Sequence, residues 1–426
     1  MKIKIKKRTL EEVLALPRPK HQKPKRPSLL FRTLVRVASI PDLWAVRARY
    51  TFPNKKEILR KPCLILMNHS CFLDLELASR ILYPRPYCIV STTDGLVGKA
   101  WLMRQLGCIP TQKFVSDLRL IRDMKYALNE KRSHVLMFPE AGYSFDGCAT
   151  ALPDKLGGIA KLLGVNVVMI RTEGAFLRDP LYNGLQKRKV RVRAVCELLA
   201  SKEQIESSSA EELSEIIGQA FAFDAFAQQA REGIEIHEPF RADGLHRILY
   251  KCPHCLAEGR MKGEGIRIAC TACGRSYRLD PLGRLAAEEG EGAFSHVPDW
   301  FRWERECVRD ELEMGSYSLD TEVEIGMLVD HKALYMVGKG RLRHTDRGFV
   351  LCDGEGKTLY EQKPLFSYCL NADFYWYEIG DVIGIGNAEA LYYCFVPGGV
   401  SVAKARLATE ELYRMSQTAK RSRIAK

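Results

Sequence analysis

His69 and Asp74 stand out as side chains whose types and spacing could do acid–base chemistry together. They follow the apolar run Cys63-Leu64-Ile65-Leu66-Met67. Residues at this spacing point to different faces of a helix, but they can meet if His69 lies in a turn and Asp74 in the first turn of the next helix. The apolar run predicts a buried parallel strand, and residues 74–82 predict that helix. The carboxylate would then fix the imidazole tautomer and leave the other ring nitrogen as a general base.

Four further segments follow downstream, and with Asn68-His69 and Asp74 they resemble the ordered motifs of the glycerolipid acyltransferase family. The best-known members of that family are the lysophosphatidic acid acyltransferases. The segments are Gly107-Cys108-Ile109-Pro110-Thr111-Gln112-Lys113, Phe138-Pro139-Glu140-Ala141-Gly142-Tyr143-Ser144, Asp154-Lys155-Leu156-Gly157-Gly158-Ile159-Ala160 and Asn166-Val167-Val168-Met169-Ile170. The resemblance covers about the first half of the chain.

This resemblance implies transfer of an acyl group from a thioester to a hydroxyl. His69 would be the general base and Asp74 its orienting carboxylate, and no covalent enzyme intermediate is required. Glu140 would hydrogen-bond acceptor hydroxyls, and Lys113 would receive a phosphate as a point charge. The substrate-binding residues implied are Glu140, Lys113, Gly142, Pro139 and Lys155.

Two positions depart from the family's third motif. Ala141 stands where the family has Gly, and Tyr143 stands where it commonly has Arg. Loss of a bidentate phosphate donor leaves acyl transfer intact but leaves the acceptor open. Lys155, Lys161 and Arg171 could compensate. Gly142 has a second interpretation, as a residue that supplies a positive φ in a turn.

Two Cys-x2-Cys pairs, Cys252 with Cys255 and Cys270 with Cys273, have the spacing of a zinc ribbon. Four thiolates close the coordination shell and leave no open position for substrate, so we expect a structural Zn²⁺. Docking of a nucleic acid or protein is the functional alternative. The other cysteines are scattered through apolar stretches, which favours free buried thiols in a reducing cytoplasm.

The formal net charge of +13 and the pI near 9.1 imply an anionic partner. Basic residues among prolines open the chain and predict a disordered arm. Residues 29–40 predict an amphipathic helix that lies either in a membrane interface or on the protein core. Since no apolar run reaches transmembrane length, we expect a cytoplasmic protein, peripheral on the inner face of the cell membrane. The partners expected are an anionic membrane surface and lipid substrates, and no nucleic acid.

Composition and periodicity predict an α/β acyltransferase domain followed by a zinc ribbon and a small antiparallel β-rich domain. The β-rich domain, several strands closed by one helix, suggests a pleckstrin-homology-like barrel. The predicted boundaries are a basic arm and amphipathic helix at 1–49, the acyltransferase domain at 50–245, the ribbon at 246–285, a linker and helix at 286–315, the β-rich domain with its terminal helix at 316–415 and a basic tail at 416–426.

The function predicted is transfer of a fatty acyl group from acyl-CoA or acyl carrier protein to the hydroxyl of a lysophospholipid. The simplest acceptor is 1-acylglycerol 3-phosphate, which would give phosphatidic acid. One alternative is acylation of a different lipid or amino-lipid, which Tyr143 motivates. Another is a non-catalytic docking protein that uses the ribbon and the β-rich domain.

Overall fold

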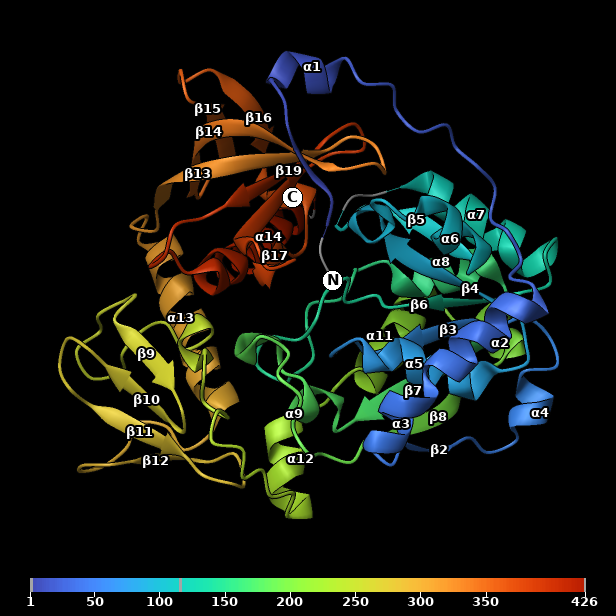
Figure 1. The fold of residues 1–426 in the computed structure, drawn as a ribbon, viewed down its shortest axis with the longest axis horizontal. Coiled ribbons are helices and arrows are strands. Elements are labelled where there is room, and N and C mark those ends of the chain that lie inside the picture. The colour runs from blue at the N-terminus through green and yellow to red at the C-terminus, as the bar shows by residue number, and fades with distance from the viewer. Residues whose placement is uncertain (1–2, 115–116, 425–426) are drawn as a thin grey trace. The chain divides into compact units, whose positions relative to one another are not determined.

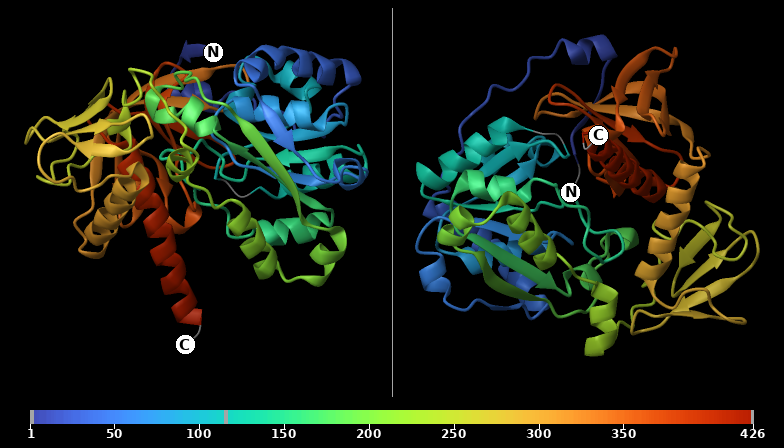
Figure 2. Two further views of the ribbon diagram at one scale, coloured as in Figure 1. Left: turned by 90° about the horizontal axis from the view of Figure 1, so that it is seen from below. Right: turned by 180° about the vertical axis from the view of Figure 1, so that it is seen from behind.

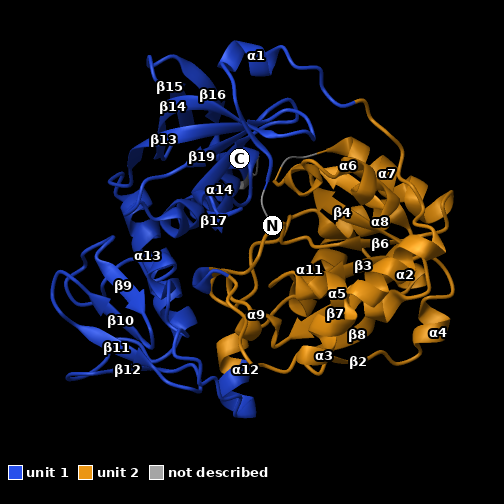
Figure 3. Ribbon diagram, viewed as in Figure 1, with its two compact units in different colours: residues 1–19, 182–184, 228–426 blue, residues 20–181, 185–227 orange. Residues whose placement is uncertain are grey.

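The structure is a computed structural model that describes residues 3–114 and 117–424 (Figure 1). The outer ends of the predicted basic arm and basic tail, residues 1–2 and 425–426, lie outside the described residues. The chain forms two compact units (Figure 3): residues 1–19, 182–184 and 228–426 make unit 1, and residues 20–181 and 185–227 make unit 2.

Unit 2 is built on a seven-stranded sheet in the order β2-β8-β7-β3-β6-β4-β5. Its strands are β2 (Arg49–Thr51), β3 (Leu64–Met67), β4 (Tyr87–Thr92), β5 (Cys108–Thr111), β6 (His134–Met137), β7 (Val167–Glu173) and β8 (Arg193–Ala200). β3 pairs in parallel with both β6 and β7, whereas β7 and β8 run antiparallel. The buried parallel strand predicted before His69 is therefore confirmed.

Helices cover both faces of this sheet, as expected for an α/β domain. Successive residues of β3 point to opposite faces: Ile65 and Met67 join a core with α3 and α5, and Leu64 and Leu66 join another with α7, α8 and α11. The helices are α2 (Leu29–Ala38), α3 (Ile40–Ala45), α4 (Lys55–Ile58), α5 (Leu73–Leu82), α6 (Ala100–Gln105), α7 (Leu118–Asn129), α8 (Leu156–Leu163), α9 (Ala175–Arg178), α10 (Lys202–Ser207) and α11 (Ala210–Ala220); α12 (Ala225–Glu232) follows.

Close packing between two helices explains why residue 157 is a glycine. A Cβ on Gly157 of α8 would lie 2.0 Å from the carbonyl oxygen of Ala210, the first residue of α11. Only glycine fits this approach. α11 begins at a capping box between Ser209 and Glu212.

The ribbon in unit 1 is a four-stranded antiparallel sheet of β9 (Met261–Glu264), β10 (Arg267–Cys270), β11 (Ser276–Leu279) and β12 (Leu285–Ala287). The sequence placed its end at Leu285, but β12 runs to Ala287 because that residue pairs with Tyr277. α13 (Val297–Glu313) follows and contains the helix predicted over residues 300–312.

The β-rich part of unit 1 has the strand order β16-β15-β14-β13-β19-β18-β17. Its strands are β13 (Leu319–Leu328), β14 (Leu334–Thr345), β15 (Gly348–Asp353), β16 (Thr358–Gln362), β17 (Asn371–Trp376), β18 (Gly380–Gly386) and β19 (Leu391–Phe395). α14 (Val402–Ile424) ends the chain as one continuous helix (Figure 2). The expected run of antiparallel strands followed by a helix is confirmed, and the pleckstrin-homology-like assignment stays a prediction.

Two terminal segments are more ordered than predicted. In the basic arm, β1 (Ile5–Lys7) pairs in parallel with β14, and α1 (Leu10–Leu14) begins at a capping box of Thr9 and Glu12. The prediction of a disordered arm was wrong for these residues because β14 offers hydrogen-bonding groups that composition cannot reveal. Residues 416–424 of the predicted tail belong to α14.

Candidate active site

The candidate site lies at the carboxyl ends of three adjacent parallel strands, β7, β3 and β6. His69 follows β3, Glu140 follows β6, and Thr172 is near the end of β7. Carboxyl ends of parallel strands meet at one edge of an open sheet, which is where such sheets bind ligands. The topology therefore gathers residues that are more than 100 positions apart in the sequence, as Asn68 and Thr172 are (|i−j| = 104).

His69 and Asp74 meet as predicted. The imidazole Nδ1 lies 3.1 Å from Asp74 Oδ2, and Asp74 is the second residue of α5. The carboxylate is fully buried, so this contact fixes an Nδ1–H tautomer that donates to Asp74. Nε2 is then the ring nitrogen with a free lone pair, as a general base requires.

Asp74 is itself held by three further donors. The backbone N–H groups of Ser70 and Cys71 donate to Oδ2 at 2.7 Å and 3.1 Å, and the Thr172 hydroxyl donates to Oδ1 at 2.9 Å. Thr172 N–H also donates to Asn68 Oδ1 at 2.7 Å, while Asn68 Nδ2 donates back to the Thr172 carbonyl at 3.1 Å. Asn68 and Thr172 thus position the carboxylate, a role that the sequence did not assign to either.

Glu140 lies in the same site, with contacts that differ from the predicted ones. Its side chain is fully buried: Oε2 accepts from the backbone N–H of His69 at 2.8 Å, and Oε1 accepts from Thr150 N–H and Oγ1 at 3.1 Å and 2.9 Å. Ser144 N–H donates to the His69 carbonyl at 3.1 Å. These bonds join the His69 turn to the turn after β6, so the described contacts of Glu140 position His69.

Aromatic side chains of the turn after β6 pack around the His69 imidazole. The Phe138 ring centroid lies 4.1 Å from that of His69, and the Tyr143 centroid lies 4.5 Å away with the ring edge-on. Pro139 is buried in the same turn. Tyr143, at the position where the family commonly has Arg, therefore packs against the base.

The positive φ in this turn falls on Ala141, at 53°, rather than on Gly142 as the second interpretation proposed. This matches the departure at Ala141, because the family has Gly there and glycine adopts positive φ without a Cβ penalty. A Cβ on Gly142 would meet open space.

The two potential nucleophiles beside His69 are unsuited to covalent catalysis. Ser70 and Cys71 are both buried, and the Cys71 thiol points to the Ala175 carbonyl at 3.7 Å. Burial, with a smaller contribution from the Asp74 charge, raises the pKa of Cys71 well above its ordinary value. A thiol that stays protonated is a poor nucleophile.

The predicted phosphate-binding cations are dispersed. Lys113 follows β5 and is half-buried, Lys155 is exposed just before α8, and none of the contacts between described residues joins either to the His69 turn. Of the compensating candidates, Arg171 pairs with Glu173 at 3.6 Å and Lys161 donates to the Ser208 carbonyl. The phosphate roles of Lys113 and Lys155 stay predictions.

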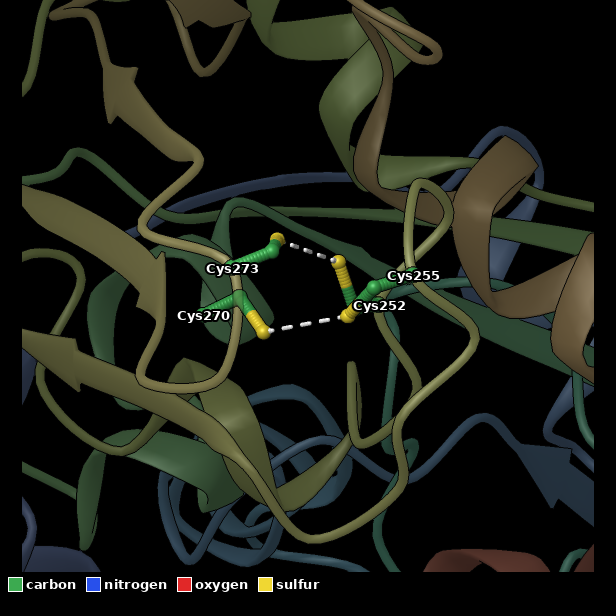
Figure 4. Close-up of side chains that lie close together, drawn as sticks. All are labelled: Cys252, Cys255, Cys270 and Cys273. Atoms are coloured by element: carbon green, nitrogen blue, oxygen red, sulfur yellow. Dashed lines mark hydrogen bonds between the residues drawn. The ribbon is translucent and has the colours of Figure 1, made fainter.

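The four ribbon cysteines come together in unit 1 (Figure 4). All four Sγ atoms lie within 4.8 Å of one another, with 3.7 Å between Cys252 and Cys273 and 3.6 Å between Cys255 and Cys270. None of them forms a disulfide. Tetrahedral Zn–S bonds of about 2.3 Å put sulfurs about 3.8 Å apart, so the cluster has the dimensions of a four-thiolate zinc site.

These observations define an α/β domain with an oriented His69 imidazole at the carboxyl edge of its sheet. Residues 49–170 match the family model described as Acyltransferase. This part of the chain is therefore an acyltransferase domain, as the motifs around His69 and Glu140 predicted. A solved structure to which the chain is similar is that of the 1-acyl-sn-glycerophosphate (LPA) acyltransferase PlsC from Thermotoga maritima, at 15% identity and a TM-score of 0.37 over 44% of this chain and 76% of that one.

A separate property concerns membranes. Within residues 3–114 and 117–424, no helix combines the length and apolarity needed to cross a bilayer.

Proposed function

We propose that this acyltransferase transfers a fatty acyl group from a thioester donor to the hydroxyl of a lysophospholipid, most simply 1-acylglycerol 3-phosphate. The observation that carries the proposal is the fixed tautomer of His69. Its Nδ1 faces a buried carboxylate that accepts from Ser70, Cys71 and Thr172 as well.

The reaction needs His69 to accept one proton and then pass it on, and it needs no covalent enzyme intermediate. Nε2 accepts the acceptor's hydroxyl proton as the oxygen attacks the thioester carbonyl. The carbon–sulfur bond then breaks, and the thiolate of coenzyme A or acyl carrier protein leaves and takes up the proton from the imidazolium. Asp74 stabilises the imidazolium between these steps. Glu140 holds the backbone of the base at 2.8 Å, so the base is positioned before substrate arrives.

The acceptor class rests on the resemblance of the motifs and on Lys113 as its phosphate ligand. Tyr143 favours a second candidate within the same chemistry, a lipid or amino-lipid acceptor without a phosphate beside the base, because an aromatic ring replaces a cation there. The non-catalytic alternative is disfavoured by the intact His69, Asp74 and Glu140 contacts and by the family match.

We expect His69→Ala to lower kcat by roughly 10²–10⁴-fold, the range typical of a lost general base. The assay combines purified protein with acyl-CoA or acyl carrier protein donors and a panel of lysolipids, with products identified by mass spectrometry. His237→Ala, which removes an exposed histidine of unit 1, is the matched control and should keep wild-type turnover. Equal turnover by the His69→Ala protein would refute the mechanism. Turnover only with uncharged acceptors would replace the phosphorylated acceptor by the second candidate.

Two further proposals accompany this function. The four cysteines of the ribbon bind one structural Zn²⁺, as the sulfur spacings support.

The protein acts as a peripheral enzyme on an anionic membrane. α2 buries none of its residues and presents apolar side chains to solvent, and Trp44 of α3 is 81% exposed. Phe72, beside the catalytic turn, is 61% exposed and could contact the same lipid.

A further inference from the structure

The first knuckle, the turn from Cys252 to Cys255, is preceded by a residue that α13 holds in place. Lys251 directly precedes Cys252, and both of its backbone groups are engaged by this helix. Its N–H donates to Glu304 Oε1 at 2.8 Å, and its carbonyl accepts from Trp300 Nε1 at 3.0 Å. The position of one proposed metal ligand is therefore linked to a helix that lies outside the ribbon sheet.

Four charged side chains form a network of ion pairs next to the same knuckle. Lys251 Nζ lies 3.3 Å from Glu258 and 3.4 Å from Glu311, and Lys404 Nζ lies 2.7 Å from each of the same two carboxylates. Lys251 and Glu258 flank the knuckle and also form a β-bridge. Glu311 is on α13 and Lys404 is on α14. The alternating cations and anions thus join the knuckle to both long helices of unit 1.

The second knuckle reaches α13 through Tyr277 of β11. The Tyr277 ring centroid lies 5.2 Å from that of Trp300, and its hydroxyl lies 2.9 Å from His254 Nε2 in the first knuckle. Trp300 is fully buried and contacts the segments that lead to both knuckles. His254 is therefore a partner of Tyr277 and need not bind metal.

Two buried polar atoms make this junction costly to form. Glu304 is fully buried, and among the described residues its Oε2 has no hydrogen-bond partner; the hydroxyl of the buried Tyr250 also has none. A buried polar group without a partner destabilises the folded state. These atoms lower the stability of the junction, and a metal ion bound by both knuckles would add a stabilising constraint.

We propose that a metal ion bound by Cys252, Cys255, Cys270 and Cys273 stabilises the packing of α13 against α14 in unit 1. The ion would keep Lys251 and Glu258 paired on either side of the first knuckle, and these two residues would in turn hold Lys404 and Glu311 in place. We call this role of the metal the brace. This inference rests on the proposed zinc site. Its consequence is that the ion stabilises the β-rich end of the protein as well as the ribbon, whereas unit 2 has no ligand in the cluster and should not respond.

The test uses the full chain purified with Zn²⁺, and compares hydrogen exchange before and after removal of the metal by a chelator. We expect one zinc per chain by elemental analysis. After chelation, peptides from residues 297–313 and 402–415 should exchange at least tenfold faster, while peptides from β3 and α5 keep their rates. Cys148→Ser, which removes a partly exposed cysteine of unit 2 outside the cluster, is the control and should bind zinc and keep its protection.

The possible failures are distinguishable. Absence of zinc would overturn both the site and the brace. Zinc whose removal speeds exchange only in residues 250–275 would overturn the brace and leave the site intact. Glu311→Gln keeps all four cysteines, so it should bind zinc with the same stoichiometry but show faster exchange in α13 and α14 with the metal present. Unchanged exchange in this variant would show that the charged junction does not connect the metal site to α13 and α14.

Discussion

Asp74 depends on a residue that lies far from it in the sequence. Thr172 is 98 positions away, and its hydroxyl donates to Asp74 Oδ1 at 2.9 Å. The His69–Asp74 pair could be predicted because strand, turn and helix are local patterns. Thr172 could not, because only the pairing of β3 with β7 brings it to the carboxylate. Glu140 was predicted at the site from the resemblance of its motif, but its burial against the His69 backbone depends on the neighbouring strand.

We expect Thr172→Val to reduce kcat about tenfold and to leave KM nearly unchanged. The substitution keeps the side-chain shape and removes one hydrogen bond from a buried carboxylate, a loss of about 1–3 kcal/mol. Steady-state kinetics on the lysolipid that turns over best would measure this. Thr172→Ser restores a hydroxyl and should recover most of the activity. If serine fails to rescue, or if KM rises while kcat holds, Thr172 does not act by positioning Asp74.

At the scale of elements, β14 and β18 are two strands that the sequence patterns missed, and both contain glycine. β18 runs from Gly380 to Gly386 and includes Gly384 as well, and turn rules count such residues as strand breakers. In β14, a Cβ on Gly340 would lie 2.2 Å from the Cys352 carbonyl, so the close approach of β15 requires glycine there. Strands with alternating apolar residues, such as β13 and β19, were predicted because their period is visible in the sequence.

The pairing of β14 with β15 also buries a titratable side chain. His344 is fully buried, stacks on Phe349 at 3.7 Å and accepts from or donates to the Tyr317 hydroxyl at 2.9 Å. Burial lowers the pKa of His344 from 6.5 to about 3. Between these values the unfolded chain binds a proton that the folded chain does not. The contribution of His344 to stability is therefore full above pH 6.5 and falls as the pH decreases toward 3.

We expect the free energy of unfolding of the β-rich region to fall more steeply with acidification in the wild type than in His344→Gln, by about 1.4 kcal/mol per pH unit below pH 6.5. Glutamine keeps a polar partner for Tyr317 and does not titrate. Hydrogen exchange of β14 and β15 amides in increasing urea, at pH 7 and pH 5, gives both free energies. Parallel pH slopes for the two proteins would show that His344 is not the group responsible.

At the scale of the whole molecule, the charge of +13 includes a group of cations that the sequence could only partly predict. Lys23 and Lys131 both lie over the Tyr126 ring, at 5.0 Å and 5.2 Å, and Arg104 donates to the Lys23 carbonyl at 2.9 Å. Among the described contacts, no carboxylate pairs with Lys23, Lys25, Arg26, Arg104 or Lys131. Like charges held together without anions of their own favour binding of an external anionic surface. The arm pattern predicted the first three of these cations; folding adds Arg104 and Lys131.

The arm residues of this group, Lys23, Lys25 and Arg26, directly precede α2, whose exposed apolar residues include Leu30 and Leu34. If the two features dock together on a bilayer, Lys23→Glu with Lys25→Glu should weaken binding to vesicles containing anionic phospholipid by at least tenfold, since each cation near such a surface contributes about 1 kcal/mol. Trp44→Ala should weaken binding to vesicles of any headgroup charge, because it removes apolar contact. Vesicle co-sedimentation at low and physiological salt measures both effects.

The matched control is Lys357→Glu with Lys363→Glu, which reverses two exposed charges on the β-rich part of unit 1 and changes net charge equally. Binding should survive this control. Equal losses from both double substitutions would mean that net charge alone attracts the protein, and that the group around Tyr126 has no special role. Wild-type binding by the Lys23 and Lys25 double variant, together with undiminished turnover of vesicle-borne lysolipid, would exclude this surface as the membrane contact and leave the acyl-transfer chemistry at His69 untouched.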